Sequence, residues 1–189
     1  MGFKQTPKTQ HAVGTLFNTY TTAKSVINPQ ALWVIPAGYL QLGDVIRIKV
    51  RGAISNIITS QPTFTFQVMM GTNIVHTSGA ILTTTTAHTT IPFDYEVMLT
   101  LDSEGSGTAA KFRGQGKLTG IMFVMAGAVA DPTTGVNVIM CPNTLPALGA
   151  GFDTTIANIL DFFVGISVSS ASNGVQIQDY EVELCTERN

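Results

Sequence analysis

Asp94 and Glu96 are the two residues of this 189-residue chain whose types and spacing best fit catalysis. Alternate residues of a strand share one face, and a rise of about 3.3 Å per residue places these two carboxylates about 7 Å apart. An inverting glycoside hydrolase uses two acids at such a separation. However, acids at alternate positions are usually just the solvent-facing half of a strand, and we favour that interpretation.

Other candidate sites in the sequence are incomplete. Asp102–Glu104 lies in a Gly-rich stretch and offers oxygen ligands for a weak Ca²⁺ site, although an acidic turn explains it better. His11, His76 and His88 are far apart and have no ligand at metal-binding spacing. Gly114–Leu118 lacks the glycine spacing and the hydroxyl of a phosphate-binding loop, and there is no G-x-S-x-G motif. We therefore predict a protein that is not an enzyme and that has no metal site and no cofactor.

The two acids lie in a strand that organises the rest of the chain. In Ile91–Leu101, large apolar residues occupy the odd positions from 93 onward, which predicts a core strand with one buried face. Asp44–Gly52 alternates in the same way and carries basic residues on its outer face. Because these charges are opposite in sign to Asp94 and Glu96, we expect the two strands to be neighbours.

The remaining segments also indicate short strands. Thr63–Met70 and Asn73–Thr77 flank a Gly-containing turn and predict a hairpin, whereas the Thr-rich Ser78–Thr90 is typical of a crossing between sheets. The sequence predicts a loop over Gly127–Gly135, and Thr154–Asp161 is compatible with one short helical turn. No segment has helical periodicity over three turns. About eight to ten strands at short spacing predict an all-β fold, either an antiparallel sandwich or a barrel.

The amino-acid composition indicates the chemical character of the protein surface. Only 12% of the residues are charged while 44% are hydrophobic, so Thr, Ser, Asn and Gln must supply most of the polar surface. Such a surface suits a subunit packed in an assembly, and it suits equally a β-domain that is simply rich in hydroxyl groups. The basic residues are too few for a nucleic-acid surface, and the longest apolar run is too short to span a membrane. No apolar leader is visible, and we expect a cytosolic product with free thiols.

The N-terminal segment differs from the rest of the chain. Residues 1–43 contain three lysines and no acid, so they carry a charge of +3 against −5 for the remainder. We expect residues 1–30 to form an extended arm without a core of its own and residues 31–189 to form a single β-sandwich domain. A weakly basic arm is suited to an acidic neighbour, including a second copy of the body. The candidate residues for partner contact in this arm are Phe3, Lys4, Lys8, Leu16, Phe17, Tyr20 and Lys24.

A set of turn and strand-edge segments extends along residues 12–184. They are Gly14-Thr15, Asn18-Thr19, Pro36-Ala37, Leu42-Gly43, Ile46-Arg47-Ile48, Gly52, Gly105-Ser106-Gly107-Thr108, Gly114-Gln115-Gly116, Gly151-Phe152-Asp153-Thr154 and Asp161-Phe162-Phe163. In these segments the chain resembles the small jelly-roll head proteins of tailed bacteriophages, of the capsid decoration or minor-capsid type. The resemblance implies a jelly-roll sandwich that forms a homotrimer and binds a preformed shell from outside, with its arm reaching neighbouring subunits.

The expected function is therefore structural. We predict a non-enzymatic virion protein, made in the host cytoplasm and placed on the capsid surface, that reinforces a phage capsid. Its expected partners are the major capsid protein and further copies of itself, with no nucleic acid, membrane or small-molecule substrate. Two alternatives stay open: a phage-borne carbohydrate- or receptor-binding module, for which Tyr20, Trp33 and Tyr39 are scattered candidates, and a glycan hydrolase that uses Asp94 and Glu96.

Overall fold

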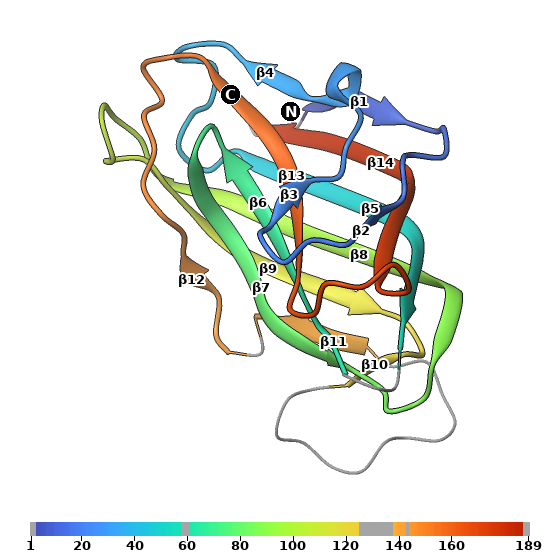
Figure 1. Cartoon of the computed structure of the whole chain (residues 1–189). Helices are drawn as coiled ribbons and strands as arrows, with labels where there is room; N and C mark the ends of the chain where they lie inside the picture. The colour runs from blue at the N-terminus through green and yellow to red at the C-terminus, as the bar shows by residue number, and fades with distance from the viewer. Residues whose placement is uncertain (1–2, 58–60, 125–137, 143, 187–189) are drawn as a thin grey trace.

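The computed structural model describes residues 3–57, 61–124, 138–142 and 144–186, and these residues form strands with a single short 3-10 helix (Figure 1). The strands are β1 (Phe3–Gln10), β2 (Phe17–Asn18), β3 (Lys24–Ser25), β4 (Trp33–Ile35), β5 (Val45–Asn56), β6 (Thr63–Met70), β7 (Asn73–Thr83), β8 (His88–Ser103), β9 (Lys111–Thr119), β10 (Phe123–Val124), β11 (Val138–Cys141), β12 (Ala147–Leu148), β13 (Asn158–Ile166) and β14 (Gly174–Thr186). The 3-10 helix η1 spans Pro29–Ala31.

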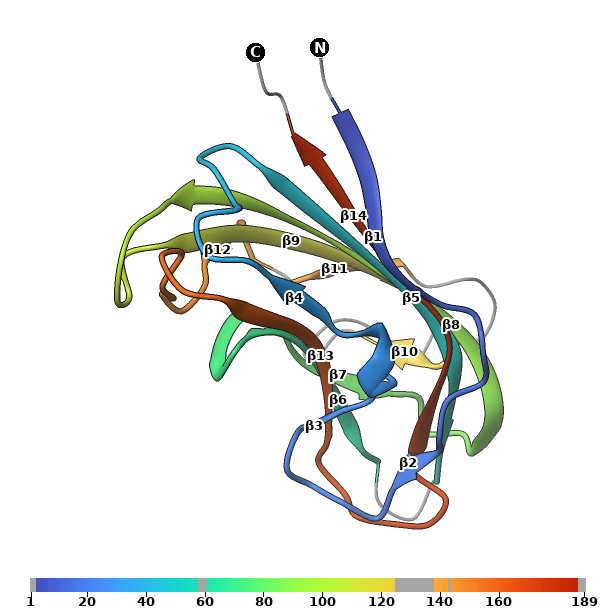
Figure 2. The same ribbon diagram turned by 90° about the horizontal axis from the view of Figure 1, so that it is seen from above.

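Two antiparallel sheets pack face to face, as expected for a sandwich (Figure 2). The first, sheet A, has the order β1-β14-β5-β8-β9-β11, and the second, sheet B, has the order β10-β7-β6-β13-β3, with β4 also paired to β13. A jelly roll has eight strands in two four-stranded sheets, with the strand orders 1-8-3-6 and 2-7-4-5. Sheet A contains the first order as β1-β14-β5-β8, and sheet B contains the second as β3/β4-β13-β6-β7. Strands β9, β11 and β12 widen sheet A beyond β8. The all-β jelly-roll sandwich predicted above is confirmed.

The core follows from the period-two alternation of the long strands. In β6 and in residues 93–101 of β8 every second side chain is buried between the sheets, while the intervening side chains face outward. Phe66 lies at the centre of an aromatic cluster, with ring centroids 5.1 Å from Tyr95, 5.7 Å from Phe93 and 6.1 Å from Phe162. Burial of these rings contributes both apolar area and favourable ring contacts.

The predicted neighbours of the organising strand are correct. Strand β8 contains Ile91–Leu101 and lies between β5 and β9, and Asp94 pairs directly with Arg51 of β5. The hairpin β6–β7 is also as expected. However, β7 continues to Thr83, so the crossing between the sheets is confined to residues 84–87 rather than to the whole of Ser78–Thr90. The predicted loop at residues 127–135 lies outside the described residues.

The N-terminal segment takes an extended course, but it is not independent of the core. Strand β1 pairs with β14 along its length as the edge of sheet A (Figure 2), and β3 pairs with β13 in sheet B. Tyr20, Val26 and Ile27 are buried in the main hydrophobic core. Residues 1–30 thus share the main hydrophobic core, and the segment supplies two of the eight jelly-roll strands.

Candidate functional site

The outer face of sheet A carries charges that alternate in sign from strand to strand. Along β14 they are acidic, along β5 basic, along β8 acidic and along β9 basic. Because neighbouring strands are about 4.8 Å apart, most of these charges lie close to one or two of the other sign. All ion pairs found in the described part of the chain join residues of this sheet, or His11 just after β1 to Asp179.

The two candidate catalytic acids belong to this pattern. The Oδ2 of Asp94 lies 3.3 Å from Nε of Arg51, and Glu96 forms a close ion pair with Arg47 and lies 3.8 Å from Nζ of Lys117. Both carboxylates therefore have basic partners on the strands beside them. This arrangement gives each of them a role in pairing the strands of sheet A.

Glu183 is the most enclosed charge on this face. Its side chain is only 3% exposed, although it points outward from β14, because Lys4 of β1 and Lys49 of β5 cover it. Nζ of Lys4 lies 2.6 Å and Nζ of Lys49 lies 3.1 Å from the same carboxylate oxygen. Burial raises the pKa of Glu183, but the hydrogen bonds and charges of the two lysines outweigh it and lower the pKa overall. This contact ties β1 to the sheet.

A groove of about 460 Å³ crosses the outer face of sheet A. It runs over four adjacent strands, from Gln178 on β14 across Arg51 and Gly52 on β5 and Asp94 on β8 to the end of β9. Its volume is in the usual range for a small-molecule site. It is far roomier than the closed seam at the end of the sandwich described below.

The outer face of sheet B is different in character. Charged residues in its strands are limited to Lys24 and Asp161. Asp161 already has hydrogen-bond partners within the protein. Its Oδ1 accepts hydrogen bonds from the Oγ of Ser25 at 2.9 Å and from the backbone N–H of Phe162. Burial raises the pKa of Asp161, and these hydrogen bonds offset part of the effect. Sheet B thus has almost no charge to offer a partner.

Apolar side chains face outward from sheet B instead. Val34 is 57% exposed and lies opposite Ile159, which is 45% exposed. Ile74 is 38% exposed and lies opposite Met69, and Phe163 is half-buried on the same side of β13. We call this set of five residues the neutral face.

Most of the seven arm residues predicted to contact a partner contact the protein itself. Lys4 pairs with Glu183, and Nζ of Lys8 donates to the backbone oxygen of Gln30. Tyr20 is buried, Phe17 packs edge-on against it, and Nζ of Lys24 lies 5.3 Å from the centre of the Tyr20 ring. The backbone of Phe3 pairs with Thr186. Leu16 is the one for which a large exposed apolar surface is described, at 50%.

A buried polar cluster lies between the sheets. Nε2 of His76 on β7 is 2.9 Å from Oη of Tyr95 on β8, and both side chains are inaccessible to solvent or nearly so. Gly114 and Gly116 make room for them, because a Cβ at either position would lie less than 3 Å from one of the two side chains. Burial lowers the pKa of His76 to about 4 and raises the pKa of the nearby Cys141 thiol to about 12. Both groups are therefore uncharged at neutral pH.

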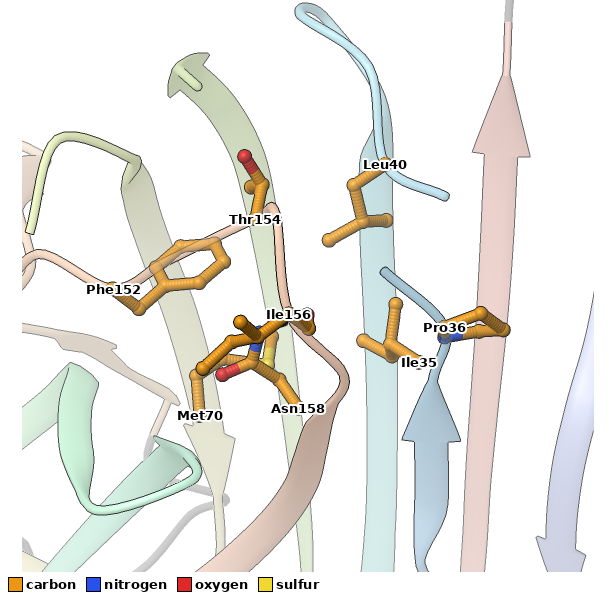
Figure 3. A pocket seen from close by; sticks show the side chains of 8 residues that line it. All are labelled: Ile35, Pro36, Leu40, Met70, Phe152, Thr154, Ile156 and Asn158. Atoms are coloured by element: carbon orange, nitrogen blue, oxygen red, sulfur yellow. Dashed lines mark hydrogen bonds between the residues drawn. The ribbon is translucent and has the colours of Figure 1, made fainter. Parts of the chain in front are cut away.

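The seam at one end of the sandwich is closed. Leu40, Ile35 and Phe152 converge there with Met70 (Figure 3), and the space between them is too narrow to admit a water molecule. Among the described residues, no group of His, Cys, Asp and Glu side chains is arranged to hold a metal ion. No helix within the same residues is long and apolar enough to span a membrane.

The aromatic residues considered for sugar binding do not form a surface. Tyr20 and Trp33 are buried, and Tyr39 packs edge-on against Trp33 with a centroid distance of 6.1 Å. The sequence reasoning missed the groove on sheet A. Gly52 in the middle of an alternating strand was the available signal, because an interior glycine often marks a bulge or a close approach of backbone.

No family model matches the sequence, and no curated protein matches it either. Among solved structures, the chain is similar to the CBM2 module of the evolved Dit of Lactobacillus casei BL23 phage J-1. The identity is 12%, the match covers 100% of this chain and 99% of the other, and the TM-score is 0.37. Because the TM-score is this low, neither fold nor function is transferred from that structure.

Proposed function

We propose that this protein is a non-enzymatic virion structural protein that binds and reinforces a phage capsid, as a decoration, cement or minor-capsid subunit. The observation that carries the proposal is the contrast between the two outer faces. Sheet A exposes apolar side chains such as Met98 and Met140 too, but it also carries many paired charges. The neutral face on sheet B exposes large apolar side chains on a nearly uncharged surface. Exposed apolar surface of this kind is typical of an interface. The jelly-roll topology and the sequence resemblance to phage head proteins agree with this proposal.

The proposed mechanism uses the sandwich as a rigid body. Val34 and Ile159 form one exposed apolar pair and Ile74 with Met69 forms another, so the neutral face can pack against a capsid subunit or a further copy of the chain. Each contact is modest, but symmetry repeats it across a shell and the summed contacts oppose opening of the shell. The expected partners are the major capsid protein and the chain itself as a homotrimer.

The arm has a different place in this proposal from the one predicted from sequence. Deletion of residues 2–28 would remove β1 and the buried Tyr20, Val26 and Ile27, so loss of shell binding by that variant would not distinguish a lost contact from unfolding. Substitutions at exposed positions are needed instead.

The test is a charged double substitution on the neutral face, Val34→Lys with Ile159→Lys. Met98→Lys is the matched control, because Met98 is 49% exposed but lies on sheet A. We expect the wild-type protein to have a solution mass of about 60 kDa, three times 20.1 kDa, and to co-sediment with empty capsid shells. Burying two lysines costs several kcal/mol, so the double variant should bind shells at least about 100-fold more weakly while the control binds normally.

Two results would refute the proposal. One is a wild-type protein that does not co-sediment with shells at any concentration. The other is a double variant that keeps wild-type mass and wild-type shell binding, which would show that the neutral face is not the interface. Circular dichroism of each variant establishes that the substitutions leave the sandwich folded.

A further inference from the structure

The groove on sheet A lies in the middle of the sheet and not at an edge. Its residues come from β14, β5, β8 and the end of β9, and in each pair of adjacent strands the backbone groups are already paired. An extended peptide that binds by adding a strand needs free backbone groups at a sheet edge. The groove therefore suits a small ligand that is recognised by side chains.

A local irregularity shapes the groove. Between Ile177 and Asp179 the pairing of β14 with β5 shifts by one residue, so Gln178 is the extra residue of a β-bulge and its side chain points to solvent. Opposite the bulge, Gly52 allows the two backbones to approach, because a Cβ there would lie 2.3 Å from the carbonyl oxygen of Gln176. The groove thus depends on this bulge and on a residue without a side chain.

The floor of the groove is mostly apolar. Pro92 and the half-exposed Ile121 line it, and Gly52 and Gly120 add backbone surface without side chains. Apolar surface of this kind can pack against C–H groups of a ligand.

Polar groups with unused hydrogen-bonding capacity surround this floor. The side chains of Gln178 and Thr119 make no hydrogen bond within the described part of the chain, and each can both donate and accept. Arg51 donates through Nε to Asp94 and through one terminal nitrogen to Asp179, which leaves its other terminal nitrogen available. Asp94 accepts from Arg51 through Oδ2, which leaves Oδ1 available.

The charges at the groove balance each other. Arg51 and Asp94 form an ion pair at 3.3 Å and are both about half exposed, so the site favours neither an anion nor a cation. An anion such as phosphate requires an excess of basic groups, and a metal ion requires clustered oxygens. A ligand with many hydroxyl groups and an apolar C–H face matches the remaining donors, acceptors and floor.

We propose that the groove formed by Arg51, Gly52, Asp94, Thr119, Ile121 and Gln178 is a binding site for a neutral saccharide. Hydroxyl groups of the sugar donate to Asp94 and to the amide oxygen of Gln178, and they accept from Arg51 and from the amide nitrogen of Gln178. The C–H face of the sugar ring lies on Ile121 and the glycine backbone. This function is separate from capsid binding and does not depend on it.

The test begins with the full-length chain. The labelled protein is applied to an array of neutral and acidic glycans, and the binders are then titrated by calorimetry together with maltotriose, cellotriose, triacetylchitotriose, sialyllactose and inorganic phosphate. We expect saturable binding of at least one neutral glycan. Gln178→Ala and Asp94→Asn should each weaken it at least tenfold.

Thr100→Ala is the matched control, since Thr100 is an exposed hydroxyl on β8 outside the groove. It should bind the glycan as the wild type does, and thermal unfolding of each variant reports whether the sandwich is intact. The proposal is overturned if no neutral glycan binds in either assay or if only sialyllactose or phosphate binds. Binding that survives both groove substitutions unchanged also overturns it, because the sugar would then bind elsewhere.

Discussion

Acid should destabilise this protein through His76. Its imidazole is buried and neutral, with a pKa lowered to about 4, whereas the same group in the unfolded chain has its ordinary pKa of about 6.5. The unfolded state therefore takes up a proton at a higher pH than the folded state does. The contribution to the free energy of unfolding is fully present above pH 6.5 and is lost as the pH falls toward 4.

The size of the effect follows from the two pKa values. A difference of about 2.5 units corresponds to about 3 kcal/mol in total, of which about 2 kcal/mol is lost between pH 7 and pH 4.5. Tyr95, which is hydrogen-bonded to His76, and Cys141, which lies near Tyr95, have raised pKa values and do not titrate in this interval. Carboxylates elsewhere do titrate, so the effect of His76 must be measured as a difference between variants.

Urea unfolding of the wild type and of His76→Gln at pH 7, 5.5 and 4.5 isolates this difference. Glutamine stays uncharged, so the variant should lose about 2 kcal/mol less than the wild type between pH 7 and 4.5. Tyr95→Phe is the control, because it removes the hydrogen bond to His76 but keeps the titrating imidazole in the core. Its stability should fall with pH as steeply as that of the wild type. Equal slopes for His76→Gln and the wild type would refute the reasoning.

Three further predictions concern stability. Glu183→Gln should lower the free energy of unfolding by about 2 kcal/mol at pH 7, because it breaks charged hydrogen bonds to Lys4 and Lys49. Because the pKa of Glu183 is lowered in the folded state, this loss should shrink as the pH falls below the ordinary pKa of a glutamate and through the lowered one; no difference at pH 7 would contradict the prediction. Phe66→Ala should cost about 3–5 kcal/mol in chemical unfolding, since it removes the ring at the centre of the aromatic cluster; a cost below about 1 kcal/mol would show that the cluster is loosely packed. Gly52→Ala should lower the melting temperature through a cost of about 1–3 kcal/mol, because the added methyl group meets the carbonyl oxygen of Gln176; an unchanged melting temperature would count against the close approach at the bulge.

The long strands were predictable because their signal is local. Alternation along Asp44–Gly52 and Ile91–Leu101 identified the buried face of each strand, and the opposite signs of their outer residues correctly predicted that they pair. The sandwich followed from many such segments with short turns between them. Each of these inferences uses residues that are close in sequence or a simple complementarity of charge.

Strand β1 was not predictable in this way. Its residues are polar and include Pro7, which lies at the shift in register between Gln5 and Lys8, where a missing N–H is tolerated. The strand is held by backbone pairing with β14 and by the ion pair of Lys4 with Glu183, and among its residues 4–10 only Gln10 is buried. A segment of this composition reads as an unattached arm until its partner strand is known.

The sequence by itself determined that this chain forms strands, which face of each long strand is buried, and that the surface carries few charges. Only the tertiary structure decided how those faces are distributed in space. Periodicity separates inside from outside within one strand, but it does not say which strands are neighbours. The pairing of β4, β13, β6 and β7 gathers apolar residues into the neutral face, and the bulge in β14 opposite Gly52 opens the groove on sheet A. Both candidate sites are therefore products of strand order and register, which distant parts of the chain set together.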